Sequence, residues 1–432
     1  MPRHSSTPTD PVTVSGDGTL PAVTLTAPDD RALTERFEPI FARIAEGAST
    51  RDAERRLPVT EIRELADAGF GAVRVPVEHG GLGATLPQLF ELLTALAAAD
   101  PNITQALRGH FAFVEDRLVA APGLDRERWL RRFVGGELVG NAWTEVGDVK
   151  LGEVGTTVSP RPDLGAGRFT VNGQKYYSTG SIFADWIDTY AERTDTGQRV
   201  IAAVSTHQEG VILQDDWDGF GQRTTGTGTT SYVDAEVLEE DIVDFDTRFK
   251  YQTAFYQVVL LAVLAGSARA AERDVAAALA GRRRSFSHGA AAIAAEDPQL
   301  LQVIGEVAGA GFAGEAVVRR AAQFLQGSYE AALGRGEGTV TAEEEERRND
   351  EAELASAEGQ VALTRLVTAS ISNAFDALSA SSTSSTKNLD RHWRNARTAA
   401  THNPWVYKAR LVGDRSVNGA ALPRVWAIGA TS

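Results

Sequence analysis

Apolar positions in the first third of the 432-residue chain recur at helical spacing. The first such segment begins near Arg31, and its apolar residues share one helical face. These residues are Leu33, Phe37, Ile40, Phe41 and Ile44. A second helix is predicted between Pro58, which suits a helix start, and Gly69, which suits a stop. After an extended piece with a glycine turn, the pattern predicts helices over 86–99 and 103–120.

The middle of the chain, 135–245, follows a different pattern. Small, aromatic and hydroxyl residues alternate between glycines, which predicts short antiparallel strands joined by tight turns. Asn172-Gly173 is typical of a type I′ hairpin turn between two such strands. We therefore expect an α+β protein with a mobile tail at 1–30, a helical domain at 31–134, a β domain at 135–245 and a helical bundle at 246–432.

Helical patterns return after Phe245 and continue almost to the end of the chain. The segment 255–280 is apolar on nearly every side, which predicts a helix buried in a bundle or at a subunit contact. Two more long helices are predicted over 300–333 and 351–379. The acidic run at 343–351 between them is expected to be a solvated loop or a helix start.

Composition narrows the classes of function. A formal charge of -15 disfavours binding to nucleic acid, which requires clustered Lys and Arg. The chain has no Cys, and its seven His occur singly without metal-ligand spacing, so we expect no metal site. No apolar run reaches the roughly 18–20 residues of a membrane span, and no secretory signal is visible. We expect a cytoplasmic protein that is not embedded in a membrane.

Three stretches leave their roles open on residue pattern alone. His110 lies on a predicted helix beside apolar residues, where a half-buried core histidine and a pocket residue are both consistent with the pattern. The cationic cluster 282–286 suits either phosphate binding or the C-terminal end of a helix dipole. The stretch 216–230, with an aromatic residue, an Arg and many hydroxyls, suits either a simple loop or a binding surface.

Several motifs together resemble the acyl-CoA dehydrogenase superfamily from about Arg31 to Asn418. They are Leu65-Ala-Asp-Ala-Gly-Phe70, Glu78-His-Gly-Gly-Leu-Gly83, Trp143-Thr-Glu145, Asn172-Gly-Gln-Lys175 and Ala184-Asp185. The resemblance implies an N-terminal helical domain, a central antiparallel β-barrel or sandwich and a C-terminal four-helix bundle. It also implies a flavoprotein.

The C-terminal motifs differ from those of the dehydrogenase branch. Where dehydrogenases carry a Tyr-Glu-Gly-Thr turn with the catalytic base, this chain reads Arg397-Thr-Ala-Ala-Thr-His-Asn-Pro404. Together with the run 388–398, this resembles the flavin-dependent monooxygenase branch, to which dibenzothiophene monooxygenase belongs. A flavoprotein dehydrogenase acting on an acyl thioester remains the alternative. A helical scaffold that has lost flavin is a third possibility.

The monooxygenase resemblance implies a two-component enzyme. Its cofactor would be reduced FMN, or FAD, delivered by a separate NAD(P)H-dependent flavin reductase. Reaction with molecular oxygen would form a C4a-(hydro)peroxyflavin, which would oxygenate a small apolar, aromatic or heteroatom (S or N) substrate. Members of this branch are typically homotetramers, so a homotetramer is expected here.

The same resemblance assigns the candidate catalytic residues, and side-chain chemistry suggests the binding residues. Candidate catalytic residues are His402, Asn141, Thr179, Ser178 and His110. Candidate flavin-binding residues are Trp143, Thr144, Thr179, Arg283, Phe286, Arg391 and Arg394, with the arginines suited to the phosphate. Candidate substrate-binding residues are Phe113, Trp217 and Phe255, for each of which core packing is the alternative. Ala399 and Val114 depart from the branch, which often has a His and an aromatic residue there.

Overall fold

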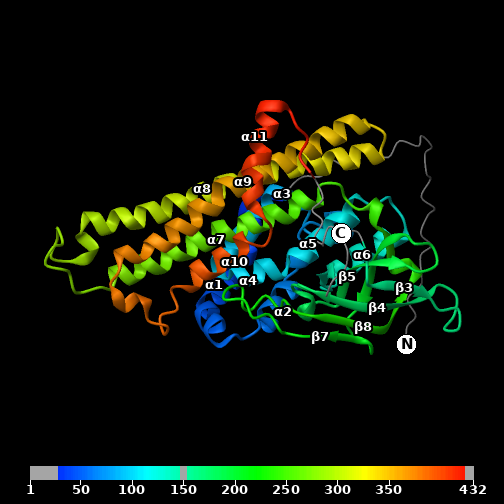
Figure 1. The fold of residues 1–432 in the computed structure, drawn as a ribbon, viewed down its shortest axis with the longest axis horizontal. Coiled ribbons are helices and arrows are strands. Elements are labelled where there is room, and N and C mark those ends of the chain that lie inside the picture. The colour runs from blue at the N-terminus through cyan, green and yellow to red at the C-terminus, as the bar shows by residue number, and fades with distance from the viewer. Residues whose placement is uncertain (1–27, 146–152, 424–432) are drawn as a thin grey trace, which may run out of the picture.

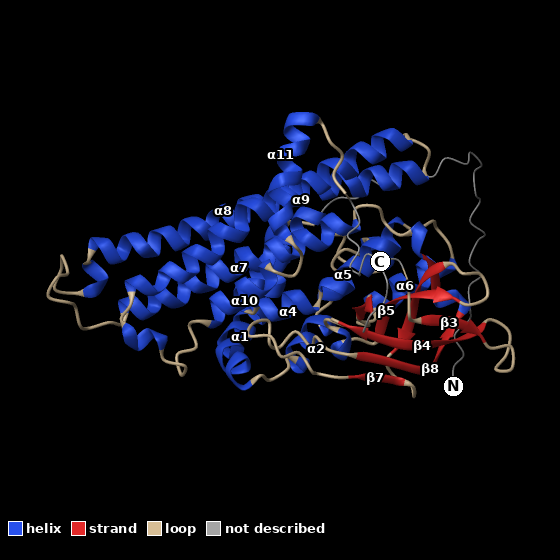
Figure 2. Cartoon of the chain, viewed as in Figure 1, coloured by secondary structure: helices blue, strands red, loops and turns tan. Residues whose placement is uncertain are grey.

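A computed structural model describes residues 28–145 and 153–423 of the chain. Long helices lie side by side at one end of the molecule and a single β-sheet lies at the other, with the N-terminal helices between them (Figure 1). Figure 2 shows the same separation of helix and strand. The predicted tail, residues 1–30, lies almost wholly outside the described residues.

The N-terminal part consists of six helices. They are α1 (Asp30–Glu54), α2 (Val59–Asp67), α3 (Leu86–Ala99), α4 (Pro101–Ala106), α5 (Arg108–Val119) and α6 (Leu124–Val134). The predicted apolar face of α1 is buried, which confirms that helix. The single helix predicted over 103–120 is wrong, because the chain breaks at Leu107 into α4 and α5. This break turns the start of α5 toward the sheet.

The sheet contains nine strands in the described chain. They are β1 (Val139–Ala142), β2 (Thr144–Glu145), β3 (Thr157–Pro160), β4 (Arg168–Tyr176), β5 (Trp186–Arg193), β6 (Arg199–Ser205), β7 (Val211–Leu213), β8 (Thr230–Leu238) and β9 (Ile242–Asp244). The order is β7-β8-β4-β3-β5-β6-β9, with β1 beside β5 and β2 beside β4. A separate apolar core lies within the sheet region.

Two features of the sheet correct the sequence prediction. The sheet is mixed rather than antiparallel, because β1 and β3 both pair with β5 in parallel. The long connections from these strands to β5 allow that direction. Asn172-Gly173 forms no hairpin turn, because β4 continues through it with a register shift opposite β8. Gly173 has φ +146° and lies against Thr156, so it accommodates a β-bulge.

The C-terminal part is helical. It contains α7 (Gln252–Ala280), α8 (Pro298–Gly336), α9 (Ala342–Asn373), α10 (Arg391–Ala400) and α11 (Lys408–Asn418). The acidic run predicted as a loop or helix start is the start of α9, capped by Thr341. By length and hydropathy, α7 and α8 pass a test for membrane spans, but 89% of the apolar window of α7 is buried within the protein. That burial matches the predicted core helix.

Candidate active site

Five segments distant in the sequence meet where the sheet contacts the helices. They are the end of β1, the turn after β4, the loop 222–228, the start of α5 and the turn after α10. Gly180 makes this meeting possible, because it has φ +81° and a Cβ there would lie 2.0 Å from the Ala106 carbonyl oxygen. The Gly180 N–H donates to the Thr225 carbonyl. The turn after β4 is therefore held against both α4 and the loop.

Asn141 lies in β1 with its side chain against the start of α5. Its backbone carbonyl accepts a hydrogen bond from Ser181 Oγ at 3.1 Å. Its side-chain oxygen is buried and has no hydrogen-bond partner within the described chain. A Cβ on Gly109 would lie 2.7 Å from that oxygen, so the absence of a side chain on α5 leaves room for the amide. Asn141 thus offers an unused acceptor for a ligand.

The turn after β4 supplies two hydroxyls, on Ser178 and Thr179. Ser178 Oγ is buried and has no partner among the described residues. Thr179 Oγ1 hydrogen-bonds Thr227 Oγ1 at 2.9 Å, which in turn bonds Thr225 Oγ1 at 2.7 Å. The Ser178 N–H donates to Gly228 O. The turn thus presents one free hydroxyl and one that is oriented by a chain of threonines.

His402 is brought to α5 by the turn that follows α10. Its Nε2 lies 3.0 Å from Nη2 of Arg108. A guanidinium donates hydrogen bonds and cannot accept them, so Nε2 accepts here and the imidazole is neutral with its hydrogen on Nδ1. Desolvation of the ring, and next the Arg108 charge, lower the pKa of His402. His402 is exposed as a whole residue, whereas Arg108 is buried.

Trp143 contacts a buried group of charged side chains. Its indole N–H donates to Asp188 Oδ1 at 2.9 Å, and Arg248 donates to Asp188 Oδ2 at 2.8 Å. Arg248 also forms an ion pair with Asp116 at 3.2 Å. The pKa of Asp188 is raised, mainly by burial. The next residue, Thr144, is half-buried in β2 and pairs with Tyr176.

His110 lies apart from His402 and is fully hydrogen-bonded. Its Nε2 lies 2.8 Å from the Gly71 carbonyl oxygen, and its Nδ1 accepts from the Val139 N–H at 3.2 Å. Both ring nitrogens are therefore used, one in linking α5 to β1 at Val139 and the other in linking it to the turn at Gly71. These contacts favour the structural alternative that the sequence left open for His110.

Acid should destabilise the protein in part through His110. Burial lowers the pKa of His110 to about 4, against a usual value of about 6.5. Below pH 6.5 the unfolded chain binds the proton and the folded chain does not, so this stability is complete above about pH 6.5 and is lost as pH falls toward 4. The loss is about 3 kcal/mol. Urea unfolding at several pH values measures it. His110→Gln should show a smaller loss over this range, whereas the exposed His288→Gln should behave as wild type.

The predicted phosphate-binding residues are spread over two regions. Arg391 pairs with Asp274, and Arg394 pairs with Asp52 at 2.7 Å and with Asp390 at 2.7 Å. Arg283 and Phe286, by contrast, are exposed after the end of α7, with Phe286 65% exposed. Arg391 and Arg394 thus hold the C-terminal helices to acidic partners. Arg283 has no such partner among the contacts of the described chain.

The predicted substrate-binding aromatics also separate. Phe113 is fully buried with its ring centroid 4.7 Å from that of Trp129, and Phe255 is fully buried 5.4 Å from Phe90. These positions agree with the core-packing alternative for both. Trp217 is half-buried in the loop that precedes the threonines, and its indole N–H donates to the Gly221 carbonyl at 3.0 Å.

Two residues of the site were not predicted. Arg108 was visible only as the residue before Gly109, and Tyr256 only as part of an apolar helix. The Arg108 guanidinium lies 5.0 Å from the centre of the Tyr256 ring. The Tyr256 hydroxyl is buried without a partner in the described chain, and burial raises its pKa further above its usual value of about 10. No local motif identifies this pair, because α5, α7 and the turn after α10 meet only in the fold.

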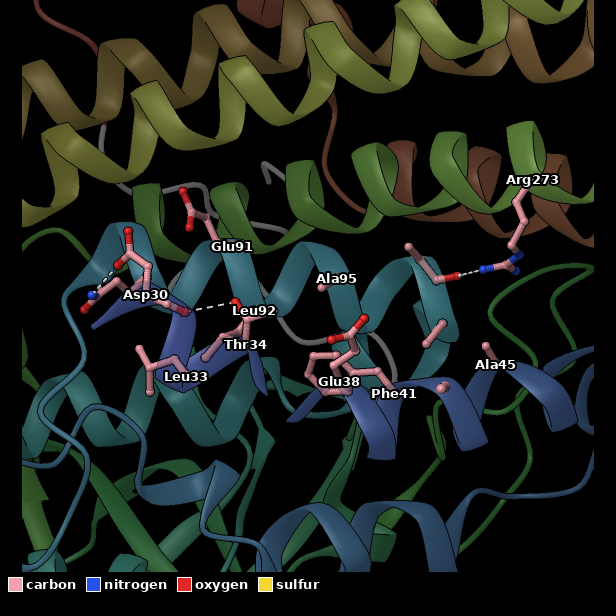
Figure 3. Close-up of a pocket in the computed structure, with 14 residues that line it drawn as sticks. Asp30, Leu33, Thr34, Glu38, Phe41, Ala45, Glu91, Leu92, Ala95 and Arg273 are labelled. Atoms are coloured by element: carbon pink, nitrogen blue, oxygen red, sulfur yellow. Dashed lines mark hydrogen bonds between the residues drawn. The ribbon is translucent and has the colours of Figure 1, made fainter. Parts of the chain in front are cut away.

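A surface groove of about 370 Å³ lies elsewhere, between α1 and α3 (Figure 3). Its floor is apolar, with Leu33, Phe41 and Leu92 among the lining residues. Arg273 at one end donates to the Ala98 carbonyl. None of the predicted site residues lines this groove.

Comparisons with known proteins agree on the family. Family models described as the N-terminal and the C-terminal domains of acyl-CoA dehydrogenase match residues 28–137 and 258–405, together more than half of the chain. Dibenzothiophene monooxygenase of Mycolicibacterium goodii is 28% identical over 375 residues, covering 83% of this chain and 87% of that protein. The probable FMNH2-dependent monooxygenase SfnC of Pseudomonas putida is 24% identical, covering 88% and 93%.

A solved structure is also similar over nearly the whole chain. It is TdsC from Paenibacillus sp. A11-2 in complex with FMN and indole. The TM-score is 0.80 at 26% sequence identity, and the match covers 91% of this chain and 98% of that one. The fold is shared, with an N-terminal helical part, a mixed sheet and a C-terminal helical part following one another along the chain.

Proposed function

The chain belongs to the acyl-CoA dehydrogenase superfamily, in its flavin-dependent monooxygenase branch, and on that premise we propose that it uses reduced FMN to oxygenate a small apolar, aromatic or sulfur- or nitrogen-containing substrate. A separate NAD(P)H-dependent reductase supplies the flavin. One observation carries the proposal: the start of α5 contacts both Asn141, whose side-chain oxygen lies against Gly109, and His402, whose Nε2 bonds Arg108.

The unused polar atoms of the site suit FMN. An isoalloxazine ring carries both acceptors and donors along one edge, and the Asn141 amide and Ser178 hydroxyl are buried groups with unused hydrogen-bonding capacity. Thr179 adds a hydroxyl oriented by Thr227. Burying such groups without partners costs about 1–3 kcal/mol each, so a ring that bonds them stabilises the site.

Acidic side chains near the site are engaged elsewhere, which disfavours thioester dehydrogenation. That reaction needs a free carboxylate as the base. Glu145 pairs with Lys175, and Asp188 is bonded by both Trp143 and Arg248. The described part of the chain thus offers an imidazole at this place rather than an unpaired carboxylate.

When bound, reduced FMN supplies the oxygen chemistry, through the C4a-(hydro)peroxyflavin of this proposal. The protein contributes hydrogen bonds, orientation and exclusion of water. Ser178 and Thr179 would hydrogen-bond the ring and would slow proton loss from it. His402, with its hydrogen on Nδ1, would be the group that donates a hydrogen bond to the oxygen that is transferred. Asn141 orients substrate or ring through an amide that both donates and accepts.

Two exposed surfaces support self-association, and we extend the proposal to a homotetramer. The apolar window of α8 is only 28% buried, and Phe312 on it is 70% exposed. Large exposed apolar faces of this kind mark protein contacts. Arg283 and Phe286 are also exposed, and in an assembly Arg283 would be available to pair with the FMN phosphate of a neighbouring subunit and Phe286 to contact the rest of that flavin.

Gly109→Ala should weaken FMN binding without unfolding the protein. The added methyl group would lie 2.7 Å from Asn141 Oδ1 and push the amide away, while alanine favours the helix itself. We expect the dissociation constant for FMN to rise about 10- to 100-fold, the equivalent of one lost buried hydrogen bond. Fluorescence titration of FMN measures it. Gly305→Ala is the matched control, because its Cβ meets open space on α8, and an equal effect there would contradict the role of Asn141.

Rapid mixing tests the proposed function. The protein is first mixed with photoreduced FMN in the absence of oxygen, and the mixture is then combined with oxygenated buffer. We expect a near-ultraviolet absorbance band, distinct from that of oxidised FMN, that outlives the reaction of free reduced flavin. Oxidation at the rate of free flavin would indicate a scaffold without oxygenase activity. Reduction of bound FMN by an acyl thioester would instead support a dehydrogenase.

A further inference from the structure

Arg108 differs from the other buried arginines of the described chain. Each of the others forms an ion pair with a carboxylate, and these are Arg51, Arg74, Arg117, Arg248 and Arg391. Arg108 is 6% exposed and has no carboxylate among its contacts there. Its Nε is buried and without a hydrogen-bond partner. Arg108 is therefore a desolvated cation whose counter-charge is not among the described residues around it.

The groups that do contact Arg108 are neutral. His402 accepts its hydrogen bond through Nε2 and is uncharged in that role. Tyr256 lies under the guanidinium, and burial raises its pKa well above the neutral range, so it is a phenol rather than a phenolate at neutral pH. Burial lowers the pKa of Arg108 only to about 10, so its charge persists. A buried, uncompensated ion costs several kcal/mol, which a bound anion can offset.

We propose that Arg108 is a substrate-binding residue that pairs with an oxyanion, a carboxylate, sulfinate or sulfonate, on the molecule that is oxygenated. The inference rests on the proposed function for the reaction itself. Arg108 Nε has no hydrogen-bond partner in the described chain, so the guanidinium has a donor left for an oxyanion, the group whose geometry it matches best. His402 lies 3.0 Å from it, so the anion would be held beside the imidazole and the rest of the substrate placed near Asn141.

A second anion, the reduced flavin, could pair with Arg108 in the same way. Reduced flavin can itself be an anion, with its charge on the ring, and Arg108 would stabilise that charge as well. Arg108 contacts His402, which the proposed function assigns to the transferred oxygen rather than to the ring, and this favours the substrate. The experiment separates the two sources by measuring ligand binding and flavin potential in the same variants.

The test compares an anion with its neutral isostere. The probes are para-(methylthio)benzoate and para-(methylthio)benzamide, which differ in charge but hardly in shape, and calorimetry measures their binding to the FMN-loaded protein without oxygen. We expect the benzoate to bind at least about tenfold more tightly than the benzamide. Arg108→Met should weaken the benzoate about 10- to 100-fold and leave the benzamide within a few-fold, and Arg108→Lys should restore part of the difference.

Three results would overturn the proposal. The first is equal binding of the two probes to the wild-type protein, a measurement that does not require Arg108→Met to fold. The second is unchanged binding of the benzoate to a folded Arg108→Met variant. A shifted midpoint potential of bound FMN with unchanged benzoate binding would assign Arg108 to the flavin. Because binding is measured without turnover, failure here is distinct from failure of the rapid-mixing experiment, which concerns oxygenation.

Discussion

His402→Ala should lower oxygenation of an accepted substrate by about 10²–10⁴-fold, the usual contribution of a positioned acid–base group. Oxygen consumption should continue, with the oxygen released as hydrogen peroxide, because the flavin still reacts while the imidazole hydrogen that directs the transfer is gone. The measurement is the ratio of sulfoxide product to oxygen consumed, with thioanisole as the probe. Thioanisole has no charge, so the result does not depend on the anion site at Arg108.

The controls for this experiment separate chemistry from folding. His288→Ala removes an exposed imidazole on a different part of the chain and should leave the ratio unchanged. His402→Gln keeps an amide that can still contact Arg108, so its fold and FMN affinity should be close to wild type while coupling stays low. Unchanged coupling in His402→Ala would exclude His402 from the mechanism.

Arg248→Met should be the most destabilising single change near the site, by about 3–5 kcal/mol. The substitution removes the shared partner of Asp116 and Asp188, both of which are fully buried. Asp188 is left with the Trp143 N–H and Asp116 with Arg117 and the Phe249 N–H. Urea denaturation at neutral pH measures the change.

Two comparisons test the cause of that loss. The double variant Arg248→Met, Asp188→Asn should be less destabilised than Arg248→Met alone, because Asp188→Asn removes the buried negative charge that has lost its partner. Arg31→Met, which breaks an exposed pair with Glu35, should have a midpoint close to wild type. A single Arg248→Met within about 1 kcal/mol of wild type would contradict the account, since a buried charge left without its partner should cost several times that amount.

Much of the fold follows from local pattern. The period of α1 and the apolar length of α7 each show in the sequence, because one helix needs only its own residues to establish a face. The start of α9 was left open, since its helix was predicted over 351–379 and begins at Ala342. The break at Leu107 did not show, because neither neighbour is a helix breaker. Asn172-Gly173 suggested a turn, but its pairing with β8 depends on a strand almost 60 residues away.

The site was predictable only in part, because contacts between segments distant in the sequence do not show in local pattern. Motifs identified Asn141, Ser178, Thr179 and His402, and the fold brings these segments together. The same motifs suggested His110, whose two ring nitrogens are occupied by backbone groups that no local pattern reveals. Arg108 lies two residues earlier, and its importance depends on a missing carboxylate, which only the three-dimensional surroundings can establish.

A crystal structure of the protein with FMN tests the central claim most directly, because all the proposed roles depend on where the isoalloxazine ring lies. The account predicts the ring against Asn141 and Ser178, with the His402–Arg108 pair beside its reactive face. A ring bound elsewhere, such as in the groove between α1 and α3, or a ring with His402 turned away and a carboxylate in its place, would contradict it.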